Sequence, residues 1–150
     1  MKNIKRQAGF TLIEILVVIG IIAILAAVVI VALNPARQFA QARNTQRWSN
    51  VNTILNAVTQ RMADKRGVWV LDATCLDALP AAATAVGNDV ANVDLEPCIV
   101  PTYVSTMVMD PSTGTAADTG YTIMQAAGAN GRLTVAAPGA ELSEVISVTR

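Results

Sequence analysis

The hydrophobic and polar positions divide the chain into three stretches of different character. The first is an apolar run over residues 10–33, which holds 24 residues and a single charged one, Glu14. As an α-helix this run would be about 36 Å long at 1.5 Å per residue, enough to cross the ~30 Å hydrocarbon core of a bilayer. We therefore predict a transmembrane helix here.

The second stretch, residues 34–66, keeps a helical period while most of its positions become polar. Its apolar residues recur at spacings of three and four, which puts them on one face of a helix. We predict that this stripe packs against a sheet formed by the rest of the chain. The residues of the stripe are Trp48, Val51, Leu55, Val58 and Met62, with Ile54 beside them.

Two signals mark the ends of this second stretch. Lys65 and Arg66 followed by Gly67 are typical of a helix C-terminus, because cations favour the negative end of the helix dipole and glycine ends the helix. At the other end, Asn34 could cap a new helix with Pro35 in its first turn, or one long helix could kink at the proline. We favour a kinked but continuous helix over residues 10–66.

The third stretch, residues 67–150, has the short segments and turn signals of a small sheet. Three strands are predicted near the C-terminus, and Asn130-Gly131 is a hairpin-turn signal between the first two. The strands are Tyr121–Gln125, Arg132–Ala136 and Glu144–Thr149.

The earlier part of this stretch carries weaker signals. Val68–Leu71 is predicted as a short strand, Cys75–Val86 as an alanine-rich helix broken around Pro80, and residues 87–118 as a loop. The whole pattern predicts an α+β fold: a long N-terminal helix, transmembrane in its first half, packed on a small C-terminal antiparallel sheet.

Composition and charge support a membrane segment joined to an acidic head. Hydrophobic residues make up 53% of the 150 residues and charged ones 15%, which is too apolar for an ordinary soluble domain. Residues 1–66 carry nine Lys/Arg against two acids, a net +7, and residues 67–150 carry two against nine, a net −7. Basic stems could pair with the acidic heads of neighbours. The cations are spread along one helix with few aromatics among them, so we predict no nucleic-acid partner.

Cys75 and Cys98 are the only cysteines, and histidine is absent. An even number of cysteines in a part expected outside the cytosol favours a disulfide, which would close a loop worth about 3 kcal/mol. Structural zinc usually needs four Cys/His ligands, so two cysteines disfavour it. Without histidine, P-loop or nucleophile elbow, we expect no enzyme activity.

Asp110 and Asp118 flank residues 111–114 and are candidate calcium ligands. Their spacing fits no EF-hand loop. We therefore favour a polar turn before the sheet and expect no cofactor.

Glu14 is the residue that a plain signal anchor does not explain. A carboxylate at the membrane centre costs about 2.5–3.5 kcal/mol and is usually paired. If the chain were cut after Gly9, Phe10 would carry a new amine that could meet Glu14 of a neighbouring subunit, neutralise both charges and set the axial stagger. The basic flank, residues 1–9, favours an N-terminus held in the cytoplasm, and the cysteine pair favours export of the C-terminal part.

The run from Gly9 to Glu14, GFTLIE, lies behind a short basic segment and opens an unbroken apolar helix. It resembles the processing site of type IV pilins and type II secretion pseudopilins. The resemblance implies a leader over residues 1–9, cleavage between Gly9 and Phe10 by a prepilin peptidase, N-methylation of Phe10, and a role for Glu14 in subunit register. It also implies a core helix (10–33), an amphipathic second half of the helix (34–66) and an α+β head (67–150).

Gly20 lies where such proteins often have a helix-weakening residue. It could mark a stretch that melts when subunits pack, or allow close helix approach in the membrane. The family often has a proline within the apolar segment, whereas here the nearest one is Pro35.

The resulting functional hypothesis is a pilin precursor that polymerises into a type IV pilus for adhesion, motility or DNA uptake. By resemblance, its partners are copies of itself, the peptidase, an assembly ATPase and an inner-membrane platform protein. It would be a single-pass inner-membrane precursor with its C-terminus outside, and later part of a surface fibre. The alternatives are a type II secretion pseudopilin and a membrane-tethered binding protein that does not polymerise.

Overall fold

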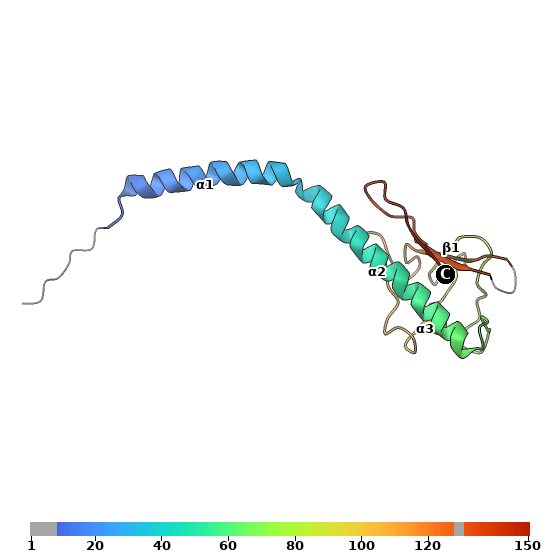
Figure 1. Cartoon of the computed structure of the whole chain (residues 1–150). Coiled ribbons are helices and arrows are strands. Elements are labelled where there is room, and N and C mark those ends of the chain that lie inside the picture. The colour runs from blue at the N-terminus through green and yellow to red at the C-terminus, as the bar shows by residue number, and fades with distance from the viewer. Residues whose placement is uncertain (1–8, 128–130) are drawn as a thin grey trace, which may run out of the picture. The chain divides into compact units, whose positions relative to one another are not determined.

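The computed structural model describes residues 9–127 and 131–150 (Figure 1). The chain forms two compact units, and the boundary between them in the sequence lies between Gln38 and Phe39. The N-terminal unit holds helix α1, Leu12–Leu33. None of the residues of α1 is buried, and its length and composition suffice to cross a membrane. The helix runs without a break through Gly20. The helix predicted over the apolar run is therefore present as one continuous element, and it begins two residues after the run does.

Asn34 separates α1 from the next helix, α2, which spans Pro35–Asp64. Asn34 lies in the left-handed region, with φ 42°, so the prediction of a continuous helix is wrong at this residue. Pro35 is the cause, because proline disfavours the α conformation in the residue before it. The side-chain oxygen of Asn34 accepts from the Arg37 N–H at 3.4 Å, so Asn34 caps the start of α2, as in the alternative interpretation.

The C-terminal unit, 39–150, is built on α2. The predicted apolar stripe is confirmed: Val51, Leu55 and Val58 are fully buried, and Trp48 and Met62 pack at its margins. The helix ends two residues before the predicted position. Arg66, with φ 64°, takes the left-handed position, and the Gly67 N–H donates to the Met62 carbonyl at 2.8 Å.

The sheet is a four-stranded antiparallel meander in the order β1-β2-β3-β4. The three predicted C-terminal strands are confirmed to within one or two residues, whereas Asn130 of the predicted turn lies outside the described residues. Inward-facing Ile123, Val135 and Ile146 share one core with α2. The strands are β1 (Thr84–Ala85), β2 (Thr122–Gln125), β3 (Leu133–Ala137) and β4 (Ile146–Thr149).

The two weaker predictions in the head are wrong. Val68–Leu71 is irregular, because Trp69 stacks on Arg61 with 5.1 Å between the guanidinium and the ring centroid, and the Val70 carbonyl accepts from the same arginine. The alanine-rich segment 75–86 forms no helix and ends in β1, because strand pairing and the contacts of Cys75 override local propensity. The predicted loop 87–118 also holds the short helix α3, Glu96–Ile99.

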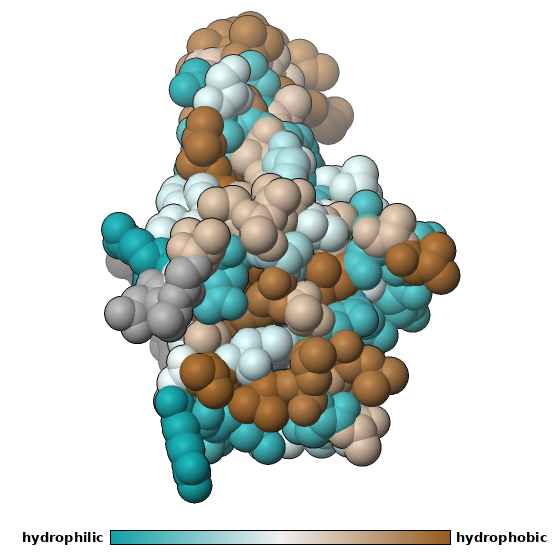
Figure 2. Space-filling view, turned by 90° about the vertical axis from the view of Figure 1, so that its right-hand side faces the viewer, coloured by the Kyte–Doolittle hydropathy of each residue, from teal (hydrophilic) through white to brown (hydrophobic). Residues whose placement is uncertain are grey.

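The head also leaves apolar side chains uncovered. On the face shown in Figure 2, hydrophobic side chains gather in patches bordered by polar ones. The exposed large apolar residues of the C-terminal unit are Phe39, Val68, Leu71, Leu76, Val90, Met109, Leu142 and Val145. Contiguous exposed apolar surface is a frequent sign of an interaction site.

Candidate functional site

The bond between Gly9 and Phe10 lies just ahead of α1, outside any helix. Both residues are exposed, Phe10 by 85%, and no heavy atom of the residues that the structure describes lies within 4 Å of a Cβ placed on Gly9. An extended and uncovered segment is the form in which a backbone can enter a peptidase site. The structure thus leaves the predicted cleavage bond accessible.

Thr11 and Glu14 form a capping box at the start of α1. The N–H and the hydroxyl of Thr11 each donate to Oε2 of Glu14 at 2.7 Å, and the Glu14 N–H donates to the Thr11 hydroxyl at 3.2 Å. Two backbone N–H groups that the helix leaves unpaired are satisfied in this way. Sequence reasoning missed Thr11, although the T-x-x-E spacing before an apolar run is the signature of this motif.

The capping box fixes where the carboxylate of Glu14 lies. It stands beside the helix start, on the border of a shallow groove of about 520 Å³ that Phe10, Ile13 and Val17 help to line. A single anionic group therefore lies within one turn of the residue that would become the new N-terminus. This arrangement can receive a cation in otherwise apolar surroundings.

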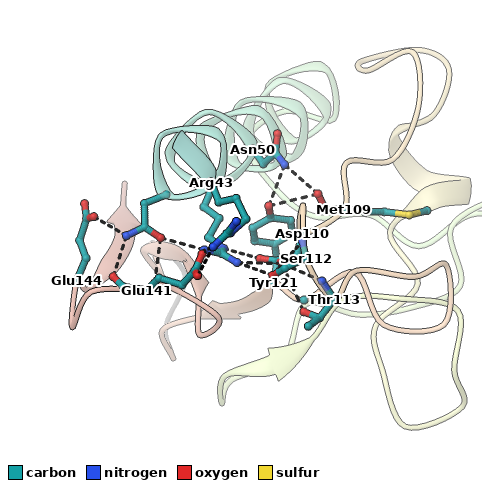
Figure 3. Close-up of polar contacts among 12 residues, drawn as sticks. Arg43, Asn50, Met109, Asp110, Ser112, Thr113, Tyr121, Glu141 and Glu144 are labelled. Carbon is teal, nitrogen blue, oxygen red and sulfur yellow. Dashed lines mark hydrogen bonds and ion pairs between the residues drawn. The ribbon is translucent and has the colours of Figure 1, made fainter. Parts of the chain in front are cut away.

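A second polar cluster joins α2 to two distant loops of the head (Figure 3). Its centre is Arg47, whose Nε donates to Asp110 Oδ2 at 2.6 Å and whose Nη2 donates to Oδ1 at 3.1 Å. The two side chains are 1% and 0% exposed. Ser112 also donates to Asp110, from its N–H at 2.9 Å and its hydroxyl at 2.6 Å. A buried carboxylate is thus fully paired, and loop 110–118 is held on the helix.

The same cluster holds the loop between β3 and β4, residues 138–145. Glu141 accepts from Nε and Nη2 of Arg43, both at 2.6 Å, and from Nη1 of Arg47 at 2.9 Å. Asn44 donates to the Glu141 carbonyl at 2.8 Å and to Glu144 at 2.7 Å. Sequence reasoning missed this cluster, because its partners are far apart in the chain.

The cluster shifts the pKa values of its members. Burial pushes the pKa of the Asp110 carboxyl upward, but the hydrogen bonds from Arg47 and Ser112 outweigh burial and hold this pKa well below its usual range. Hydrogen bonds from Arg43 and then Arg47 lower the pKa of Glu141 to about 2. The hydrogen bond to Asp110 raises the pKa of Arg47 despite burial. Arg43, Arg47, Asp110 and Glu141 are therefore all charged at neutral pH.

We expect the stability of the head to fall as the pH is lowered from about 4, the unfolded carboxyl value, to about 2. A depressed folded pKa means that the contribution is complete above the unfolded value and is lost as the pH falls through the folded one, about 2 for Glu141. Urea titrations of the detergent-solubilised chain across this pH range measure it. Glu141→Gln should reduce the change in the free energy of unfolding with pH, whereas Glu96→Gln, at an exposed position, should leave it as in wild type. The same pH dependence in wild type and Glu141→Gln would contradict a contribution from the Glu141 ion pairs.

The calcium candidates do not form a ligand set. Both carboxylate oxygens of Asp110 face donors of the protein, with Arg47 beside them, and Oδ1 of Asp118 accepts from the Gly120 N–H at 2.9 Å. Among the residues that the structure describes, no group of three or more His, Cys, Asp or Glu side chains could hold a metal. The cation beside Asp110 is an arginine of the same chain.

Cys75 and Cys98 form a disulfide, as predicted. Both residues are buried, and the bond ties the segment after α2 to α3. Nearby, Arg61 donates to the Cys98 carbonyl at 3.2 Å and to Asp72 at 2.9 Å. The irregular first part of the head is thus fastened to α2 by one covalent bond and one arginine.

Removal of the disulfide in a Cys75→Ser/Cys98→Ser double variant should lower the free energy of unfolding by about 3 kcal/mol. The reason is that the unfolded chain loses a closed loop and gains conformational entropy. Tryptophan fluorescence in a urea titration of the detergent-solubilised chain measures the change, and Val90→Ser, at a fully exposed position, is the control. An unchanged unfolding midpoint would argue against a stabilising bond.

Comparison with known proteins gives one family match. Residues 4–30 match the model of the prokaryotic N-terminal methylation motif. No curated protein and no solved structure matches the chain. The matched residues include the accessible Gly9–Phe10 bond, the capping box and most of α1, and the motif is typical of structural proteins that are processed at the membrane. Residues 4–30 of this chain are therefore the leader signature of type IV pilins and pseudopilins, followed by a long apolar helix and an α+β head.

Proposed function

We propose that this protein is the precursor of a filament subunit that polymerises into a type IV pilus. The observation that carries the proposal is α1, a 22-residue apolar helix without one buried residue, which starts two residues after the predicted cleavage bond and lies largely within the matched motif. Exposure of so much apolar surface to water is unfavourable, so such a helix needs a membrane or other helices to cover it. The membrane would cover it in the precursor and neighbouring subunits in the fibre.

Glu14 would supply the specificity of this packing. Cleavage after Gly9 frees an amine on Phe10, and the Glu14 carboxylate of an adjacent subunit is the matching anion at that depth. The pair would neutralise two charges that are costly in an apolar bundle. The one axial offset that brings them together would then set the register of successive subunits.

The head supports export of the C-terminal part. A disulfide persists in oxidising compartments outside the cytosol, and here it lies in the C-terminal unit, after the end of α2. We propose a single-pass precursor in the inner membrane with its C-terminus outside. Processing would require a prepilin peptidase, and extraction into the fibre would require an assembly ATPase and a platform protein in the same membrane.

A pseudopilin of type II secretion would use the same leader and the same helix. Electron microscopy of cells labelled on the head separates the two functions. Long surface fibres that contain this chain support the pilus, and short periplasmic assemblies support the pseudopilin. A chain that stays in the membrane as a monomer would identify a tethered binding protein instead.

The mature N-terminus provides the first direct test. We expect mass spectrometry of the chain from membranes or sheared fibres to find Phe10 as the first residue, with one added methyl group. Cells lacking the prepilin peptidase are the control and should retain Met1. An intact Met1, or a cut beyond Leu33, in cells with a working peptidase would overturn the filament proposal.

A further inference from the structure

The loop between β3 and β4, residues 138–145, turns two large apolar side chains toward solvent. Leu142 is 49% exposed and Val145 is 83% exposed. The loop is nevertheless fixed, because Glu141 and Glu144 on either side of Leu142 point back to α2 and are held there (Figure 3). Leu142 and Val145 are therefore exposed although the loop that carries them is held in place.

The backbone of this loop is held in an unfavourable conformation. Leu142 and Ser143 both have φ 58°. A leucine in the left-handed region suffers close contacts between its Cβ and the backbone, and such residues persist only where the surrounding structure holds them. Here the hydrogen bonds of Glu141 and Glu144 do so. Strained residues of this kind concentrate at functional sites, so the exposed side chain of Leu142 is a candidate contact residue.

The charges around Leu142 and Val145 are already satisfied within the head. Glu141 is paired with Arg43 and Arg47, and Glu144 accepts from Asn44 and from the indole of Trp48, both at 2.7 Å. An apolar partner could therefore cover the two side chains while every oxygen of both carboxylates keeps a side-chain donor from α2.

The other prominent exposed apolar residues are in a different electrostatic setting. Val90 is fully exposed and Leu76 is 76% exposed, and both line a groove with Asp77, Asp89 and Asp94. Each of these three acids accepts one backbone N–H, and within the described residues none has a side-chain donor or an ion pair. An apolar partner on that groove would strip water from unpaired carboxylates, so the groove is unsuited to one.

Phe39 extends the surface from the loop onto α2. It is 64% exposed and lies one helical turn before Arg43, whose guanidinium holds Glu141. We infer that Phe39, Leu142 and Val145, here called the loop patch, form a contact surface for a second copy of this chain and are covered by its apolar helix α1. The inference rests on the proposed filament function.

A second copy is the partner that the chain itself supplies. Its α1 exposes apolar side chains along its whole length, so an uncharged apolar surface is available in every subunit. The contact joins two different surfaces of identical molecules, α1 of one and the loop patch of the next. A heterologous contact of this kind repeats without closing and so builds a helical filament.

Site-specific cross-linking in cells that express the full chain tests the contact. A photo-reactive phenylalanine analogue at position 142 should give an adduct of two copies, and mass spectrometry should place its other end within residues 10–33. The same probe at position 76, on the acidic groove, is the matched control and should give no such adduct. The adduct at position 142 should disappear in a Glu14→Ala chain, which cannot set the register.

Each other outcome has a definite meaning. Fibres that form with an adduct at position 76 but none at 142, or a probe at 142 that labels only lipid or another protein, would overturn the inference and leave the filament proposal standing. Absence of fibres from every chain, with a correctly processed N-terminus, would overturn the filament proposal and the inference together.

Substitution gives a second, independent readout. Val145→Asp should reduce the yield of sheared fibres by about tenfold or more, the scale expected for an important interface residue. Its urea midpoint should stay at the wild-type value because the side chain is exposed. Val90→Asp is the control and should assemble normally. Wild-type fibre yield from Val145→Asp would overturn the inference.

Discussion

Glu14→Ala is expected to reduce incorporation into fibres by at least about 100-fold, because an amine left unpaired in an apolar bundle costs several kcal/mol. The amine in question is that of Phe10, freed by cleavage after Gly9. Processing itself should continue, since the scissile bond lies in an exposed segment outside α1. Quantitative immunoblots of sheared fibres, with mass spectrometry of the membrane fraction, measure assembly and processing separately.

The capping box supplies the matched control for this experiment. Glu14→Ala removes both the proposed intersubunit anion and the cap of α1, whereas Thr11→Ala removes only the cap. Loss of a cap costs about 1 kcal/mol of helix stability, and the membrane and neighbouring helices also support α1. Thr11→Ala should therefore assemble far better than Glu14→Ala. Equal losses in the two variants would show that Glu14 acts through the cap and not through the register.

Arg47→Met is expected to lower the free energy of unfolding by about 3–5 kcal/mol, the usual consequence of breaking a buried ion pair by removing one partner. The side chain of Asp110 is 0% exposed, and it would remain without its main hydrogen-bond donor. Met is similar in length and apolar, so loss of packing adds little. A urea titration of the detergent-solubilised chain, followed by tryptophan fluorescence, measures the effect.

Two further variants identify the cause. Arg37→Met removes an exposed cation of the same helix, which makes no ion pair within the described residues, and should change stability by no more than about 0.5 kcal/mol. Arg47→Met/Asp110→Leu removes both charges and should recover much of the loss, because the unpaired carboxylate is gone. An Arg47→Met variant as stable as wild type would contradict a stabilising ion pair between Arg47 and Asp110.

The first 33 residues of the protein could be interpreted from sequence because their chemistry is local. Membrane-spanning length, the single acid Glu14 and the segment GFTLIE are properties of neighbouring residues, and α1 and the family match agree with them. Even the missed capping box has a local signature, T-x-x-E at the start of the apolar run. The break at Asn34 was open to two interpretations because a proline can kink a helix or begin one.

The head was readable only where periodicity is regular. The stripe of α2 and the strands after Tyr121 follow helical and alternating patterns, and both were located correctly. Residues 68–86 carry apolar and alanine-rich runs whose local preferences suggested a strand and a helix. Their conformation follows instead from Arg61, the disulfide and pairing with β2, none of which a local window contains.

A reader of the sequence alone could identify a basic leader signature, one membrane-length helix with an acid near its start, and an α+β head with a pair of cysteines. Two features became visible only in the folded chain. Arg47 and Asp110, 63 residues apart, form a buried ion pair, and loop 138–145 is held on α2 with Leu142 outward. The difference arises from the distance along the chain over which the interactions act. Helical period, hydropathy and capping act over a few residues, whereas ion pairs and loop anchors depend on which distant segments the fold brings together.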